Sequence, residues 1–234
     1  MEEAPVRVYI VGANEWKSAE RWPIPGTRWT PFYLHAGGLL SEHEFWPNEP
    51  GTTYEDSPFS RGTATFTTSP IVEQTEVCGP IAVKLFASTT DEEILFFASL
   101  WHIDAAGSTS LLTRGWLRGS QRELDPGRSK PWQPYHRHAP RVPLVPGEVY
   151  EFDLEMRPYG ILLKPGERLM LKVRGADDEP PANFLHRIAQ GGVTRHTASH
   201  VTLHHDAQRP SHLLLPITRG NLIGTFLSGG VLAP

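Results

Sequence analysis

Short runs of alternating apolar and polar residues, separated by Gly and Pro, constrain the fold of this chain more than any other feature. Three clear runs are VRVYIVG (6–12), TATFTTS (63–69) and ERLMLKVRG (167–175). Alternation with a period of two is typical of strands that bury one face. The 21 Gly and 22 Pro residues interrupt the chain at short intervals and leave little room for long helices.

The pattern predicts an all-β sandwich, most simply a jelly roll, with one or two short helices. The expected strands are 6–12, 31–38, 63–69, 76–89, 94–104, 110–123, 148–156, 167–175 and 211–218. Short helices are expected at 14–22, where Asn14 could serve as N-cap, and at 183–190. Residues 37–62 should form a long polar loop. No linker divides the chain, so we expect one domain over 1–218 followed by a tail at 219–234.

Charge and cysteine content exclude several classes of function. A formal net charge of −4 gives no positive field to attract nucleic acid or anionic lipid. The apolar runs fall short of the roughly 20 residues of a membrane helix, and MEEAPVRVYIVG does not resemble a signal peptide. Cys78 is the only cysteine, which rules out an internal disulfide and fits a reducing compartment. We expect a cytoplasmic protein without nucleic-acid or membrane partners.

Motifs for common enzyme chemistries are missing from the sequence. The G-x-S-x-G elbow of an α/β-hydrolase nucleophile does not occur, and no P-loop, dinucleotide fingerprint, H-E-x-x-H or C-x-x-C is present. The sequence therefore predicts no catalytic residue, no cofactor and no metal ion in this chain.

One stretch, LTRGWLRGSQRELDPGRSKPWQPYHRH (112–138), concentrates polar and aromatic residues. Strand alternation places Trp116, Arg118 and Arg122 on one face. Beyond Asp125, six prolines within 125–148 predict an extended loop held by side-chain contacts. This pattern favours an organised polar interface or pocket, with these candidate residues: Trp116, Arg118, Arg122, Trp132, His136 and His138.

Two other functions stay open at this point. A carbohydrate-binding module could use the tryptophans expected in loops, which are Trp16, Trp22, Trp29, Trp46 and Trp132. A metal-dependent jelly-roll enzyme could use His136 and His138, or the histidines between 196 and 212. The metal reading is weaker, because the next acid after His138 is Glu148, beyond three prolines.

The order of several landmarks resembles one known family. PVRVYIVGANEWKSAERWP, PFYLHAGGLLS, TSPIVEQTEVCGPIAVKLFASTT, LTRGWLRGSQRELDP, PGEVYEFDLEM, LKPGERLMLKV and RPSHLLLPI follow one another over residues 5–218. They resemble the C-terminal, galactose-binding-like jelly-roll domain of the cocaine esterase / X-prolyl dipeptidyl-peptidase (CocE/NonD) hydrolases. The segments FWPNEPGTTYEDSPFSRG and ADDEPPANF depart from the family pattern, so no contacts are assigned to them.

The resemblance implies that catalysis is carried out by a different domain from this β domain. In that family the serine nucleophile, acid and histidine lie on an α/β-hydrolase domain, and no position of this chain corresponds to them. The resemblance therefore implies a non-catalytic domain that packs on a hydrolase domain, in cis or in trans, and helps to shape its substrate pocket. It also leaves a homo-oligomer open.

Overall fold

The computed structural model describes residues 4–44, 48–57, 62–138, 140–176 and 198–220. Within these ranges the regular structure consists of strands and two short 3-10 turns, η1 (Ala36–Gly38) and η2 (Gly119–Gln121). The expected all-β sandwich is confirmed. No helix in the described ranges is long and apolar enough to cross a membrane.

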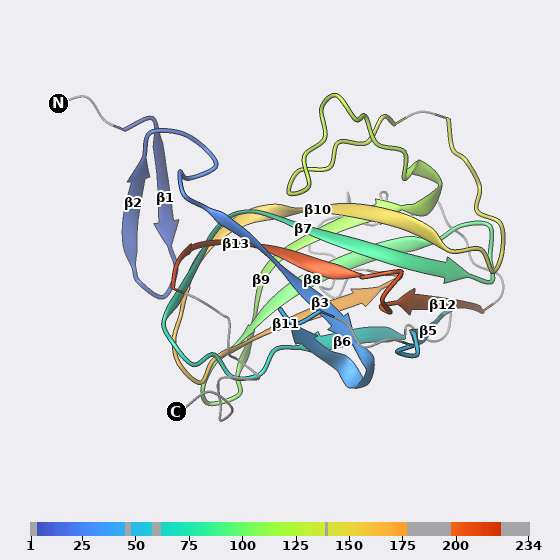
Figure 1. Ribbon diagram of the computed structural model, residues 1–234, viewed down its shortest axis with the longest axis horizontal. Coiled ribbons are helices and arrows are strands. Elements are labelled where there is room, and N and C mark those ends of the chain that lie inside the picture. The colour runs from blue at the N-terminus through green and yellow to red at the C-terminus, as the bar shows by residue number, and fades with distance from the viewer. Residues whose placement is uncertain (1–3, 45–47, 58–61, 139, 177–197, 221–234) are drawn as a thin grey trace.

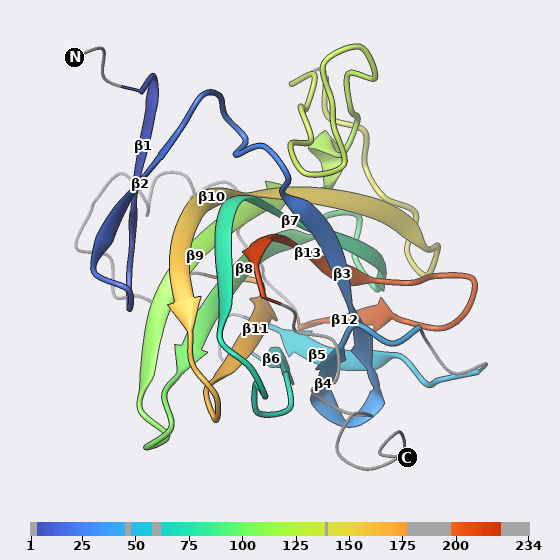
Figure 2. The same cartoon turned by 60° about the vertical axis from the view of Figure 1, so that its left-hand side comes forward.

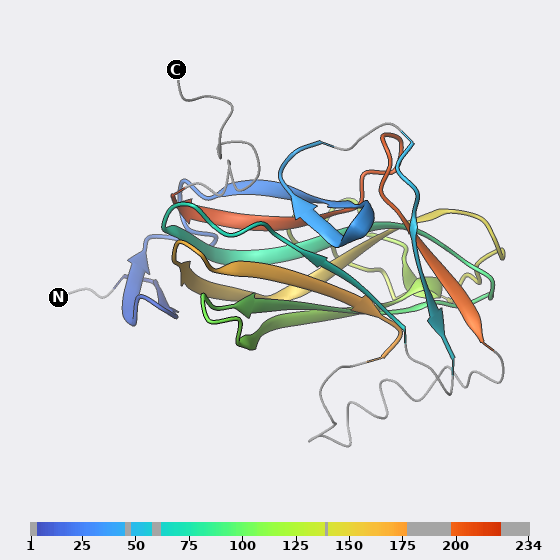
Figure 3. The same ribbon diagram turned by 90° about the horizontal axis from the view of Figure 1, so that it is seen from below.

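Two groups of strands stack face to face to form the sandwich (Figures 1 and 3). The first group contains β5 (Thr52–Asp56), β12 (Ser199–His204), β7 (Thr75–Thr89), β13 (His212–Arg219) and β3 (Arg28–His35), and β10 (Tyr150–Leu163) pairs with β7. The second contains β6 (Thr63–Thr67), β11 (Arg168–Arg174), β8 (Leu95–Ile103) and β9 (Thr109–Arg118). The short strand β4 (Leu39–Ser41) links them through an antiparallel pairing with β3 and a parallel contact with β6.

The core follows directly from the alternation in the sequence. In β6 and β11, every second side chain is buried between the layers. Phe66, Phe96 and Phe152 from three different strands are fully buried, and the rings of Phe96 and Phe152 meet edge to face at 5.0 Å. The run LFFASL at the start of β8 is buried on both faces, as expected for a strand that is central in its layer.

The N-terminal segment forms a hairpin that stands apart from the main body (Figures 1 and 2). Its strands are β1 (Val6–Ile10) and β2 (Glu15–Ala19), so the expected helix at 14–22 is wrong. Asn14 does not cap a helix but takes a left-handed conformation (φ 56°) in the turn between the strands. Antiparallel pairing of β1 with β2 is favoured here over a local helix, because Tyr9 and Trp16 face each other directly across the two strands.

Other sequence-based expectations need smaller corrections. The expected loop at 37–62 contains η1, β4 and β5. The strand expected over 110–123 ends at Arg118, where η2 begins. The helix expected at 183–190 and nearly all of the tail at 219–234 lie outside the described residues.

Candidate functional site

The candidate stretch 112–138 begins in β9, the last strand of the second layer. The residues between η2 and β10 form a raised loop above β10 (Figures 1 and 2). Trp116 and Arg118 both lie on β9 and point to its outer face, as alternation predicts. Arg122 lies beyond η2, so its expected place on the same strand face is wrong. The strand gives way to η2 at Gly119, whose amide donates to Ile94 O at 2.8 Å and whose ideal Cβ would lie 2.3 Å from Ile94 Cγ2.

A carboxylate that the sequence did not single out organises the turn. Glu93 accepts hydrogen bonds from Ser120 N (2.9 Å) and Ser120 Oγ (2.6 Å). Arg118 Nη1 lies 3.7 Å from the same carboxylate. Glu93 sits in the loop before β8, where no local pattern distinguishes it from its acidic neighbours Asp91 and Glu92. Only the pairing of β8 with β9 brings it to η2.

Two of the candidate residues hold the loop in place. The Arg122 guanidinium donates to Gly119 O (3.1 Å) and Val142 O (2.8 Å) and lies 4.5 Å from the centre of the Tyr150 ring. The Trp132 indole stacks on Trp29, with ring centres 5.3 Å apart and an angle of 13°. The expected fixing of the loop by side-chain contacts is therefore confirmed. The loop is not extended, however, because it folds back on itself through the bridges Leu124–His136 and Lys130–Gln133.

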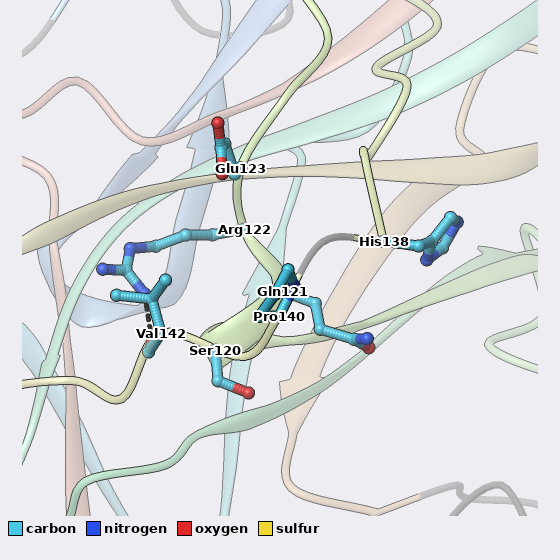
Figure 4. Close-up of a pocket in the computed structure, with 7 residues that line it drawn as sticks. All are labelled: Ser120, Gln121, Arg122, Glu123, His138, Pro140 and Val142. Atoms are coloured by element: carbon cyan, nitrogen blue, oxygen red, sulfur yellow. Dashed lines mark hydrogen bonds between the residues drawn. The ribbon is translucent and has the colours of Figure 1, made fainter.

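A small hollow of about 290 Å³ lies beside η2, lined by Ser120, Gln121, Arg122, Glu123, His138, Pro140 and Val142. Figure 4 shows Arg122 turned towards Val142, while His138 points away on the opposite side of the turn. Its polar groups do not converge on one point. This hollow does not have the arrangement of a nucleophile and base.

A larger hollow of about 420 Å³, which we call the β9–β10 groove, lies among residues of β9, β10 and the loop segment 134–138. It is lined by Arg114, Gly115, Trp116, Pro134, Tyr135, His136, His138, Glu155, Met156, Arg157 and Pro158. The groove thus brings together Trp116, His136 and His138 from the predicted set. Arg118 and Trp132 line neither hollow.

The two histidines of the groove differ in their roles. His136 Nε2 donates to Asp153 O at 2.9 Å. Its buried Nδ1 has no hydrogen-bond partner among the described residues. His138 is exposed and takes a left-handed conformation (φ 51°). In the part of the chain that the structure describes, no three His, Cys, Asp or Glu side chains come together to hold a metal ion.

The tryptophans give little support to a carbohydrate site. Trp16 lies in β2 rather than in a loop, and its ring meets Tyr9 at 62°, so the two do not form one flat platform. Trp29 lies in β3 rather than in a loop, and its ring stacks on that of Trp132. Trp22 does lie between strands, as expected, and is 40% exposed. Trp46 lies outside the described residues.

Histidines near β12 belong to buried polar networks instead. Glu49 bridges His35 Nδ1 (3.0 Å) and His205 Nδ1 (3.1 Å). His204 Nε2 lies 2.9 Å from Ser88 Oγ. Burial lowers the pKa of His205, although its hydrogen bond with Glu49 acts in the opposite direction. Burial also lowers the pKa of His204 and of His212.

Comparison with known proteins adds a family to this geometry. A family described as X-Pro dipeptidyl-peptidase C-terminal non-catalytic domain matches residues 1–214. A Mycobacterium tuberculosis protein named "Putative serine esterase" is 30% identical over 206 residues, covering 75% of this chain and 33% of that protein. The cocaine esterase of a Rhodococcus species is 24% identical over 255 residues, covering 92% of this chain and 42% of the esterase.

A solved structure shows the same fold. A CocE/NonD family hydrolase from Staphylococcus aureus superposes with a TM-score of 0.77 at 26% identity, covering 88% of this chain and 39% of the hydrolase. The chain therefore spans between about a third and two fifths of the length of these relatives.

Proposed function

Because the chain belongs to the family of X-Pro dipeptidyl-peptidase C-terminal non-catalytic domains, we propose that it is the accessory β-sandwich of a serine ester or amide hydrolase. In this role it packs on an α/β-hydrolase domain, in cis or in trans, and contributes no catalytic group. The observation that carries the proposal is the match over residues 1–214, combined with coverage of only 33% of an esterase relative.

The face around the raised loop is our proposed docking surface. It bears the six candidate residues Trp116, Arg118, Arg122, Trp132, His136 and His138. The loop is already ordered by Glu93, Tyr150 and Trp29, so little conformational entropy would be lost on docking. Trp116 and Tyr135 remain 42% and 38% exposed, and exposed aromatic side chains are enriched at protein interfaces. From this position the loop would border the substrate pocket of the hydrolase.

A domain exchange tests the proposed function. The matched C-terminal part of the mycobacterial esterase is removed, or is replaced by this chain, and hydrolysis of p-nitrophenyl butyrate is measured. We expect the truncated esterase to lose activity and the chimera to regain it. The proposal fails if the truncated esterase is as active as the intact protein, or if a folded chimera is no better than the truncated form.

Substitutions in the chimera test the docking surface. Trp116→Ala should weaken the gain in activity, because it removes the exposed ring at the centre of the proposed interface. Val72→Ala is the matched control, since Val72 is 54% exposed and lies outside this surface. Equal effects of the two substitutions would show that docking uses another face.

A further inference from the structure

We propose that the β9–β10 groove binds a carboxylate group carried on an apolar or aromatic body. Its volume of about 420 Å³ lies in the range of small-molecule pockets. This site goes beyond the proposed docking role. It is measurable on this chain alone, so its failure and the failure of the accessory-domain proposal can be told apart.

Local geometry explains why the groove exists. At Gly115, β9 approaches β10 so closely that an ideal Cβ would lie 2.1 Å from Glu155 O. The pairing of β10 with β7 shifts register between Met156 and Tyr159, and such bulges redirect side chains. Arg157 lies within this bulge, and its guanidinium is 5.7 Å from the centre of the Trp116 ring.

An arginine lies over each of two aromatic rings that line the groove. Arg157, which itself lines the groove, lies over Trp116, whereas Arg128 lies outside the lining, 3.4 Å from the centre of the Tyr135 ring. An arginine beside an aromatic ring can hold a carboxylate in a bidentate manner through its N–H donors. The rings supply an apolar surface beside those donors.

The local charge balance favours an anion. Glu155 is the only acid among the described residues that line the groove. From 114 to 141 the sequence has seven Lys or Arg and two acids, although the whole chain carries a net charge of −4. Arg118 and Arg137 are paired with Glu93 and Glu123, and the arginines that line the groove are Arg114 and Arg157.

His136 provides a further polar contact. Its Nε2 is occupied by Asp153 O, while its buried Nδ1 has no partner among the described residues. A buried polar atom without a partner costs free energy. A ligand group that donates a hydrogen bond, such as a hydroxyl beside the carboxylate, would satisfy it.

The same carboxylate could come from a free small molecule or from an acidic side chain of another protein. Nuclear magnetic resonance separates the two sources. The indole N–H signal of Trp116 is followed during titration of the chain with phenylacetate, with its neutral isostere phenylacetamide, and with capped peptides that contain one Asp or one Asn beside Phe.

We expect phenylacetate to shift the Trp116 signal in a saturable way at millimolar concentrations. Phenylacetamide should bind at least about tenfold more weakly. Arg157→Gln should weaken phenylacetate binding about tenfold, because it removes a charged donor. Arg168→Gln, an exposed arginine on β11 outside the groove, is the matched control and should leave binding unchanged.

Each result decides the proposal. Binding of only the Asp peptide supports carboxylate recognition and assigns the carboxylate to a protein partner. Equal binding of acid and amide overturns it, as does equal weakening by Arg157→Gln and Arg168→Gln. It is also overturned if neither phenylacetate nor the Asp peptide shifts the signal.

Discussion

At the scale of single residues, buried histidines determine how the protein responds to acid. Burial lowers the pKa of His204, His205 and His212, whereas unfolded histidines titrate near about 6.5. The unfolded state therefore binds more protons as the pH falls below that value, and the free energy of unfolding decreases. We expect the melting temperature to decline between about pH 7 and pH 5, measured by circular dichroism across a pH series.

A pair of substitutions isolates the histidine contribution. His205→Gln should reduce the slope of melting temperature against pH, because one buried titrating group is removed. His200→Gln, at an exposed position on β12, should preserve the slope. A melting temperature that is constant or rises as the pH falls from about 7 to 5 would contradict this account.

Glu76 is a second residue with a large expected effect, because it ties the hairpin to the sandwich. It is 3% exposed, accepts a hydrogen bond from Thr218 Oγ1 at 2.5 Å and pairs with Lys17 of β2. Burial opposes its ionisation, yet the contacts with Lys17 and Thr218 hold its pKa below the usual value. Glu76→Gln should lower the free energy of unfolding by about 1–3 kcal/mol and speed hydrogen exchange in β1 and β2.

The matched control for Glu76 lies on the surface of the same sheet. Glu151 is 48% exposed and pairs with Lys84, and exposed ion pairs contribute only about 0–1 kcal/mol. Glu151→Gln should therefore have a smaller effect in the same urea titration. Equal losses for the two variants would show that Glu76 does not anchor the hairpin.

At the scale of elements, the contact between β9 and β10 depends on a missing side chain. A Cβ at Gly115 would overlap Glu155 O, so Gly115→Ala must push the two strands apart. We expect a loss of about 1–3 kcal/mol in urea unfolding, together with shifted signals for the residues of the groove. Gly127→Ala is the control, because the nearest atom to its ideal Cβ is Asp125 Oδ1 at 3.4 Å. If both variants are equally stable, the close approach is not essential.

The elements also show what the sequence could predict. Alternation located β6 and β11 to within two residues, because each buries one regular face. It failed at 14–22, where pairing with β1 overrides local preference, and at Arg122, which lies beyond η2 rather than on β9.

The β9–β10 groove could be predicted only in part, because some of its residues are distant from one another in the sequence. The groove takes Trp116, His136 and His138 from the stretch that the sequence singled out, but it takes Arg157 from β10. The contact between Arg157 and Trp116 joins residues that are distant in the sequence and depends on a bulge. The Arg157-Pro158 pair within a strand was the available signal, because a proline inside a strand indicates an edge or a bulge.

At the scale of the whole molecule, the chain buries a core of its own. Phe32, Phe66, Phe96 and Phe152 are fully buried within the chain, and strands of both layers contribute to one continuous cluster. The chain nevertheless spans only about a third of an esterase relative. A core built within the chain and an incomplete share of its relatives' length agree with the accessory role that we propose.

We expect that this chain alone does not hydrolyse p-nitrophenyl acetate. Ser88 and His204 form a Ser–His contact of 2.9 Å, but Ser88 lies in strand β7 and pairs with Thr202 of β12. β7 is a regular paired strand and lacks the strained turn that exposes a hydrolase nucleophile. Turnover by the purified chain that is abolished by a serine-directed inhibitor would overturn the non-catalytic assignment, and its loss in Ser88→Ala would place the nucleophile at Ser88.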